Sequence, residues 1–164
     1  MRQSLRIGLI SDTHGLLRPE ALDYLAGCDH IVHGGDIGGP DILERLGAIA
    51  PLTVVRGNND TAAWARSIPE TARLDLGGVG LYVIHDLKAL DIDPVRHGVR
   101  VVVSGHSHKP ARLERGGVLY VNPGSAGRPF QPADRGGRTP GRGGAGAGQA
   151  GDLGVAYAPF PFFR

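Results

Sequence analysis

Aspartate, histidine and asparagine side chains, which are common ligands of divalent metal ions, follow five apolar segments of this 164-residue sequence. Any one of these clusters has an ordinary structural explanation, such as a helix cap beside a surface histidine or a tight turn. Five of them in succession favour a shared metal site. The clusters are Ser11-Asp12-Thr13-His14-Gly15, His33-Gly34-Gly35-Asp36, Arg56-Gly57-Asn58-Asn59-Asp60, His85-Asp86 and Ser104-Gly105-His106-Ser107-His108.

The donor types in these clusters predict two metal ions. Four imidazoles, two carboxylates and one amide oxygen are too many donors for one tetrahedral ion, and they suit two ions of roughly five- or six-coordination with places left for water. Nitrogen and oxygen donors without thiolate favour manganese, iron, zinc or nickel over calcium or copper(I). One carboxylate must bridge to hold such ions about 3.5–4 Å apart, and pairs of this kind stabilise in-line displacement at phosphorus.

The segments that precede the clusters have the pattern of buried strands. Because they are apolar throughout and alternate with helical segments, they predict βαβ units and a largely parallel sheet. The pairs Gly77-Gly78 and Gly116-Gly117 predict hairpin turns later in the chain. Strands are predicted at residues 5–10, 30–33, 52–55, 72–76, 81–84, 99–103, 111–114 and 118–121, and helices at 19–26 and 41–49.

The strand ends should bring the clusters together. In an open α/β sheet the loops beyond the carboxyl ends of the strands form the ligand crevice, so we expect the five clusters at one edge of one sheet. Residues two apart in an extended segment point the same way, so His106 and His108 could bind a single ion.

Length and composition narrow the class of protein. The chain has the size of one ordinary domain, and its single cysteine, Cys28, excludes an internal disulfide framework and a four-cysteine zinc site. No apolar run approaches the roughly 18 residues of a membrane span, and the N-terminus lacks a signal-peptide pattern. We therefore expect a soluble cytoplasmic protein that acts on no membrane.

The order and spacing of the motifs resemble the calcineurin-like metallophosphoesterase superfamily. The resemblance covers residues 5 to about 126 and includes Val121-Asn122-Pro123-Gly124-Ser125, which is similar to the small prokaryotic phosphodiesterase branch. The retromer subunit with a phosphoesterase fold is a relative. The implied fold class is α/β, a four-layer αββα sandwich of the metallophosphoesterase type with a dinuclear centre at the strand ends.

The resemblance also implies a ligand set and a reaction. Asp36 would bridge two divalent ions, expected to be Mn²⁺ with Zn²⁺, Fe²⁺ or Ni²⁺ as other options, and a hydroxide shared by both ions would attack a small phosphate ester, most plainly a phosphodiester. The first ion would be held by Asp12, His14, Asp36 and His108, and the second by Asp36, Asn58, His85 and His106.

Two positions depart from the family pattern. Asn59 stands where many members have a histidine that orients the substrate or protonates the leaving group, and an amide cannot supply that proton. The resemblance implies that Asn58 helps the metal ions to bind the phosphoryl oxygens, and Asn58 and Asn59 are the candidate catalytic residues. His85-Asp86-Leu87 replaces the frequent His-Gly-His, which keeps the ligand at His85 and loses one further contact. The alternative function is a non-catalytic scaffold of the same fold that binds protein partners.

The sequence divides into a phosphoesterase domain at residues 1–126 and a tail at 127–164. The tail holds ten glycines, five prolines and five arginines, so it predicts a disordered segment or out-of-frame translation. Its charge permits only weak nucleic-acid binding, and the rest of the chain is not basic. Loss of the strands that the family places after Ser125 would leave the second sheet incomplete at the C-terminus, with an uncovered edge that affects whether the protein is a monomer or a homo-oligomer.

Further residues near the motifs have supporting roles or structural ones. Asp60 and His33 are candidates for orienting the ligands through hydrogen bonds, although His33 could equally be a packing residue. Trp64 and Arg66 follow the Asn59 loop and are candidates for the substrate mouth. The turn at residues 122–125 could approach the site or be purely structural.

Overall fold

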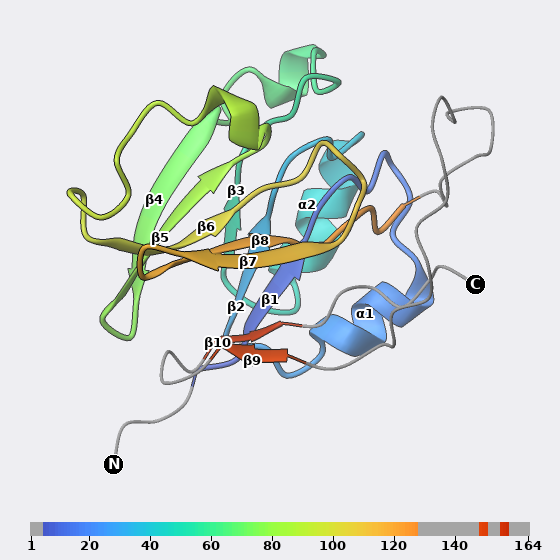
Figure 1. Cartoon of the computed structure of the whole chain (residues 1–164). Coiled ribbons are helices and arrows are strands. Elements are labelled where there is room, and N and C mark those ends of the chain that lie inside the picture. Colours follow the sequence, from blue (N-terminus) through green and yellow to red (C-terminus); the bar gives the residue numbers. More distant parts are fainter. Residues whose placement is uncertain (1–4, 128–147, 151–154, 158–164) are drawn as a thin grey trace, which may run out of the picture.

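The computed structural model describes residues 5–127, 148–150 and 155–157. The first half of the chain forms a parallel sheet of three strands in the order β1-β2-β3, with one helix in each connection (Figure 1). Its elements are β1 (Ile7–Ile10), α1 (Pro19–Leu25), β2 (His30–His33), α2 (Pro40–Gly47) and β3 (Leu52–Val54), followed by the 3₁₀ helix η1 (Ala63–Ala65).

A second sheet of five strands has the order β4-β5-β6-β8-β7. The pairs β4–β5 and β7–β8 are antiparallel hairpins, whereas β5–β6 and β6–β8 are parallel. Both hairpins turn at the predicted glycine pairs, where all four glycines have the positive φ that a tight hairpin turn requires. The strands are β4 (Thr71–Leu76), β5 (Val79–Ile84), β6 (Val99–Val103), β7 (Ala111–Arg115) and β8 (Val118–Asn122).

The alternation of side chains along the strands builds a layered core. Ile7 and Leu9 of β1 lie in the apolar cluster between the two sheets, where they meet Leu81 of β5, whereas Ile10 lies in the cluster that includes the helices. The outer face of the second sheet forms a third cluster, covered by residues near the 3₁₀ helix η2 (Leu87–Ala89). The layers are thus helices, sheet, sheet and a thin outer layer, which confirms the expected sandwich fold.

The expectation of one sheet edge is wrong in one respect. The five motifs follow β1, β2 and β3 of the first sheet and β5 and β6 of the second, so two sheets supply them. Apolar strands buried on both faces fit either a single sheet between helices or two stacked sheets, and the sequence pattern does not distinguish the two arrangements.

Strand β7 forms one edge of the second sheet. All five of its residues are exposed, and Leu113 is 58% exposed.

The predicted tail falls largely on residues that lie outside the described part of the chain. Within it, β9 (Gly148–Ala150) pairs antiparallel with β10 (Val155–Tyr157), and β10 lies against β1 (Figure 1). Among the helices that the structure describes, none has the length and apolarity to cross a membrane.

Candidate metal centre

The parallel register of the strands brings the predicted ligands together. Ile10 of β1 is paired with His33 of β2, and His33 with Val54 of β3, so these three strands end at the same level. In the second sheet Val83 of β5 is level with Val103 of β6. The side chains that follow these strand ends therefore meet across the gap between the two sheets.

Asp12, His14, Asp36 and His108 form the first cluster. One potential ligand atom from each lies within 4.8 Å of all the others. The Nε2 atoms of His14 and His108 are 3.1 Å apart, and His108 Nε2 lies 3.2 Å from Asp12 Oδ1. The Asp12 carboxylate raises the pKa of His108 above its ordinary value, with burial acting in the opposite direction.

The Asp12 carboxylate tests whether this cluster suits a cation. Its Oδ2 accepts hydrogen bonds from Ser11 Oγ at 2.6 Å and from the His106 backbone N–H at 3.1 Å. Its Oδ1 is buried and, within the described residues, has no hydrogen-bond partner, because the His108 ring is close without hydrogen-bond geometry. A buried carboxylate oxygen left in this way costs about 1–3 kcal/mol or more. A divalent cation beside His14 and His108 satisfies it, so the residues fit a metal ion.

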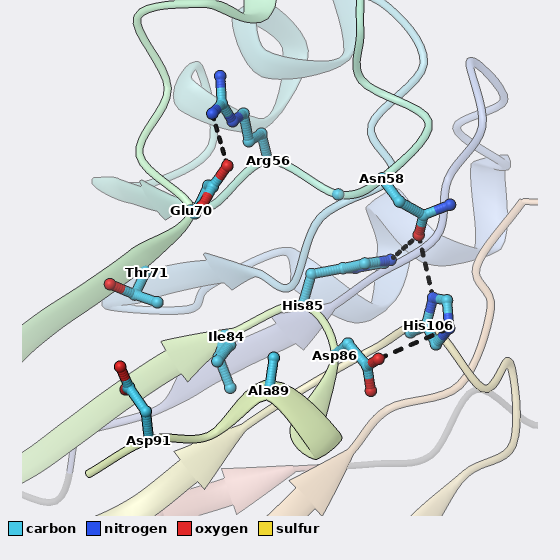
Figure 2. A pocket seen from close by; sticks show the side chains of 11 residues that line it. Arg56, Asn58, Glu70, Thr71, Ile84, His85, Asp86, Ala89, Asp91 and His106 are labelled. Atoms are coloured by element: carbon cyan, nitrogen blue, oxygen red, sulfur yellow. Dashed lines mark hydrogen bonds and ion pairs between the residues drawn. The ribbon is translucent and has the colours of Figure 1, made fainter.

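Asp36, Asn58, His85 and His106 form the second cluster. Asn58 Oδ1 lies 3.1 Å from His85 Nε2 and 3.0 Å from His106 Nδ1, and Figure 2 marks both contacts with dashed lines. Asp36 Oδ2 lies 3.5 Å from His85 Nε2 and also 3.8 Å from His14 Nε2 of the first cluster. Asp36 therefore faces both clusters.

His85 is held with one ring nitrogen free for a ligand. Its Nδ1 lies 2.7 Å from the carbonyl oxygen of Gly34, which can only accept, so Nδ1 carries the proton and Nε2 faces Asn58 and Asp36. Burial lowers the pKa of His85, but the Asp36 carboxylate and the Gly34 carbonyl, which both stabilise the protonated ring, outweigh it and leave the pKa raised.

Asn59 contacts Asp36 rather than the open cleft. Its backbone N–H donates to Asp36 Oδ1 at 2.9 Å, and its side-chain Nδ2 donates to Oδ2 at 2.6 Å. Burial alone would raise the pKa of Asp36, but the neighbouring His85 imidazole and the hydrogen bonds from Asn59 together hold it below its ordinary range. Asn59 thus orients the Asp36 carboxylate and favours its ionised form.

The expectation that the backbone at His106 and His108 is extended is wrong, and only His108 lies in the first cluster. Their backbones have φ values of +67° and +56°, which are left-handed and not extended. Asp12, His14 and Asp36 share this conformation, with φ between +48° and +55°. In residues other than glycine it costs on the order of 1–3 kcal/mol, and in the described chain it is confined to these five candidate ligands.

Buried Asp60 joins two of the ligand loops, which supports its predicted orienting role. Its carboxylate accepts the backbone N–H groups of Ile37 at 2.9 Å and Gly38 at 3.1 Å, next to Asp36, and of Gly57 at 2.8 Å, next to Asn58. Asp60 contacts no candidate ligand side chain in these bonds. It acts on the backbone of the loops that carry them.

The turn after β8 supports the loop that carries His106 and His108. Asn122 is buried, and its Nδ2 donates to the Gly105 carbonyl at 2.7 Å and to Ser107 Oγ at 3.1 Å. Ser125 Oγ donates to the Asp12 carbonyl at 2.9 Å. The turn therefore approaches the site through the backbone and supplies none of the clustered ligand atoms.

His33 is a buried, neutral histidine. Its Nδ1 accepts the Gly35 N–H at 3.1 Å, so Nε2 carries the proton and donates to Thr13 Oγ1 at 3.0 Å. Thr13 Oγ1 in turn donates to the Ile37 carbonyl at 2.8 Å. His33 thus fixes the two loops on either side of the first cluster. It is both a buried packing residue and a residue that orients the ligand loops.

We expect His33 to make stability fall in acid. Burial lowers the pKa of His33 to about 4, so between pH 6.5 and 4 the unfolded chain binds a proton that the folded chain excludes. This contribution is complete above pH 6.5 and declines by about 3 kcal/mol as the pH falls to 4. Urea unfolding of metal-free wild type and His33→Asn should therefore show their stability difference shrinking by about that amount. A constant difference over this range would contradict the assignment.

A cleft of about 370 Å³ opens beside the second cluster (Figure 2). The clusters found in the sequence supply part of its wall, Asp86 included, whereas Glu70, Thr71, Ala89 and Asp91 were not predicted because they lie outside the motifs. Trp64 and Arg66 do not line it, and Trp64 packs against the core near the helices, so their role at a substrate mouth stays a prediction. The lining residues are Arg56, Gly57, Asn58, Glu70, Thr71, Ile84, His85, Asp86, Ala89, Asp91 and His106.

Comparison with known proteins agrees with this geometry. The model of the calcineurin-like phosphoesterase superfamily domain matches residues 5–138. A probable metallophosphoesterase of Methanothermobacter thermautotrophicus is 34% identical over 131 residues, which cover 73% of this chain and 76% of that protein. The phosphodiesterase YfcE of Escherichia coli is 33% identical over 101 residues, which cover 54% of this chain and 52% of that enzyme. The Zn²⁺ complex of Vps29 from Entamoeba histolytica superposes with a TM-score of 0.64 at 25% identity, covering 77% of both chains.

Proposed function

Because the chain belongs to the calcineurin-like phosphoesterase superfamily, we propose that it is a phosphodiesterase that uses two divalent metal ions. The observation that carries the proposal is Asp12 Oδ1, a buried carboxylate oxygen that faces two imidazoles and has no hydrogen-bond partner among the described residues, as a cation ligand would. The cleft beside the second cluster provides room for a small phosphate ester. The similarity to proteins named as phosphodiesterases favours a diester as the substrate.

The two clusters define which residues would hold the ions. We assign Asp12, His14, Asp36 and His108 to the first, and Asp36, Asn58, His85 and His106 to the second. When bound, such a pair supplies Lewis acidity and lowers the pKa of water towards neutrality. Mn²⁺ is our first choice for this nitrogen and oxygen donor set, with Zn²⁺, Fe²⁺ and Ni²⁺ as the alternatives.

The side chains themselves orient the reacting groups. Asn59 and His85 keep the Asp36 carboxylate ionised and directed between the clusters. Asn58 presents its amide beside the cleft, where it can bind a phosphoryl oxygen as negative charge builds up. Asn59 has no ionisable proton to give to a leaving alcohol, so esters with good leaving groups should react best.

With a single cysteine and therefore no disulfide framework, the proposal places the protein in the cytoplasm, as a monomer or homo-oligomer.

The test is hydrolysis of bis-p-nitrophenyl phosphate and p-nitrophenyl phosphate by metal-stripped protein during a titration with Mn²⁺. We expect turnover to appear only with added metal, to saturate near two equivalents, and to favour the diester. Two bound ions without any turnover would contradict the enzymatic proposal and favour a scaffold that binds protein partners. Failure to bind metal would contradict the ligand assignment.

A further inference from the structure

Asp86 lies at the rim of the cleft with its two carboxylate oxygens in different surroundings. It follows His85 just after β5 and is the N-cap residue of η2. Its Oδ1 accepts the Lys88 backbone N–H at 3.0 Å, while its Oδ2 lies 4.0 Å from His106 Nε2 (Figure 2). One oxygen is thus anchored to the backbone, and the other faces an imidazole.

The His106 ring lies between Asp86 and the second cluster. Its Nδ1 is 3.0 Å from Asn58 Oδ1, on the side of His85, and its Nε2 is on the side of Asp86. A neutral imidazole that binds a metal through one nitrogen carries its proton on the other. In metal-bound His106 that proton would be on Nε2, which faces the Asp86 carboxylate.

We propose that Asp86 is a positioning residue for His106, whose Nε2–H it accepts so that Nδ1 is unprotonated and directed at the second metal ion. The inference rests on the proposed function, because it presupposes an ion at Asp36, Asn58, His85 and His106. A carboxylate behind a ligating histidine fixes the tautomer and increases the basicity of the ligand nitrogen. Asp86 therefore supplies a contact at the motif position where the sequence departs from the family's His-Gly-His.

An acidic residue at this position could instead serve as a helix cap or as a general negative charge in the cleft. As a helix cap alone, Asp86 would act only on η2. As one negative charge among several, it would act no differently from Asp91, which lines the same cleft. Glu70 is already paired with Arg56 at 2.6 Å. Among the described acidic residues of the cleft, only Asp86 lies within 4.0 Å of His106. The two side chains are 38% and 45% exposed, so packing does not fix their present separation.

Three variants separate these roles. Asp86→Ser keeps an N-cap hydroxyl but is too short to reach His106, Asp86→Asn keeps the cap and the size without the charge, and Asp91→Asn removes a charge elsewhere in the cleft. Metal-stripped proteins are titrated with Zn²⁺ alone by calorimetry. For Asp86→Ser we expect the second equivalent to bind about 10- to 100-fold more weakly with the first unchanged. Asp86→Asn, whose oxygen caps η2 and whose Nδ2 cannot accept the His106 proton, should lose about as much, and Asp91→Asn should match the wild type.

The ring itself provides a second measurement. In the Zn²⁺-loaded protein with ¹⁵N-labelled histidine, we expect His106 to show a protonated Nε2 that exchanges slowly with water, and faster exchange in Asp86→Ser. Wild-type affinity of Asp86→Ser for the second equivalent, or an equal loss in Asp91→Asn, would overturn the proposal. Binding of only one ion by the wild type would overturn it together with the two-ion function. Two bound ions without diester hydrolysis would overturn the function while the binding comparison still decides the role of Asp86.

Discussion

Asp36→Asn is expected to lower metal-dependent kcat/KM for bis-p-nitrophenyl phosphate at least about a thousand-fold. The reason is that one carboxylate oxygen, Asp36 Oδ2, lies 3.8 Å from His14 Nε2 and 3.5 Å from His85 Nε2, so it faces both clusters. An amide in its place lacks the negative charge that two cations share. The affinities for both metal equivalents should fall together, which distinguishes Asp36 from residues that belong to a single cluster.

The measurement pairs diester kinetics with calorimetric titration of Mn²⁺ into metal-stripped protein. Asp23→Asn, on the exposed side of α1, removes one carboxylate far from the site and should leave both quantities at the wild-type level. Thermal unfolding of the metal-free variant checks that the fold is intact. Full turnover in Asp36→Asn, or loss of only one metal equivalent, would contradict the bridging assignment.

Asp60→Ala is expected to lower the free energy of unfolding of the metal-free protein by about 3–5 kcal/mol. Asp60 is 6% exposed and accepts backbone N–H groups from Ile37, Gly38 and Gly57. Its removal leaves these donors in the interior without an acceptor and separates the loops that carry Asp36 and Asn58. The loss therefore exceeds that of an ordinary turn residue, and metal affinity should fall with it.

Asp93→Ala is the matched control for this experiment. Asp93 also accepts two backbone N–H groups, from Val95 and Arg96, but its side chain is 53% exposed and water can replace it. We expect a loss below about 1 kcal/mol in this variant. Urea unfolding in the presence of a chelator gives both values. Equal losses in the two variants would show that burial of the Asp60 carboxylate contributes nothing.

Strands β1, β2 and β6 could be predicted from the sequence because their apolar character follows from burial, whereas β4 and β7 are more exposed and are marked by the glycine pairs that end them. The segments His30–His33 and Val99–Val103 have the predicted ends, and the other strands up to β8 differ by two residues at most at either end, whereas β9 and β10 were not predicted. The division into two sheets could not be predicted in this way, because Leu9 and Leu81 pack in one cluster from different sheets. A strand's own residues record that it is buried, not which strand lies beside it.

The site was predictable in its residue types and not in its fine geometry. Strand ends place Asp12, Asp36 and His85 where the pattern puts them, since parallel strands end at a shared level. The separation of His106 from His108 depends on a left-handed backbone, whereas the prediction assumed an extended strand in which alternate side chains point the same way. The contacts of Asn59 with Asp36 and of Asp86 with His106 depend on side-chain rotamers and loop approach, which spacing along the chain does not specify.

The left-handed backbone of five candidate ligands has a consequence for how relatives of this protein diverge. Each of these positions keeps an unfavourable conformation that glycine or asparagine would adopt more easily. Selection for metal binding opposes that replacement, and selection for folding alone favours it. In a lineage that retains the sandwich but abandons the chemistry, these positions should drift first, and towards glycine or asparagine. The residues found there in a genome sequence therefore record whether the catalytic role has been kept.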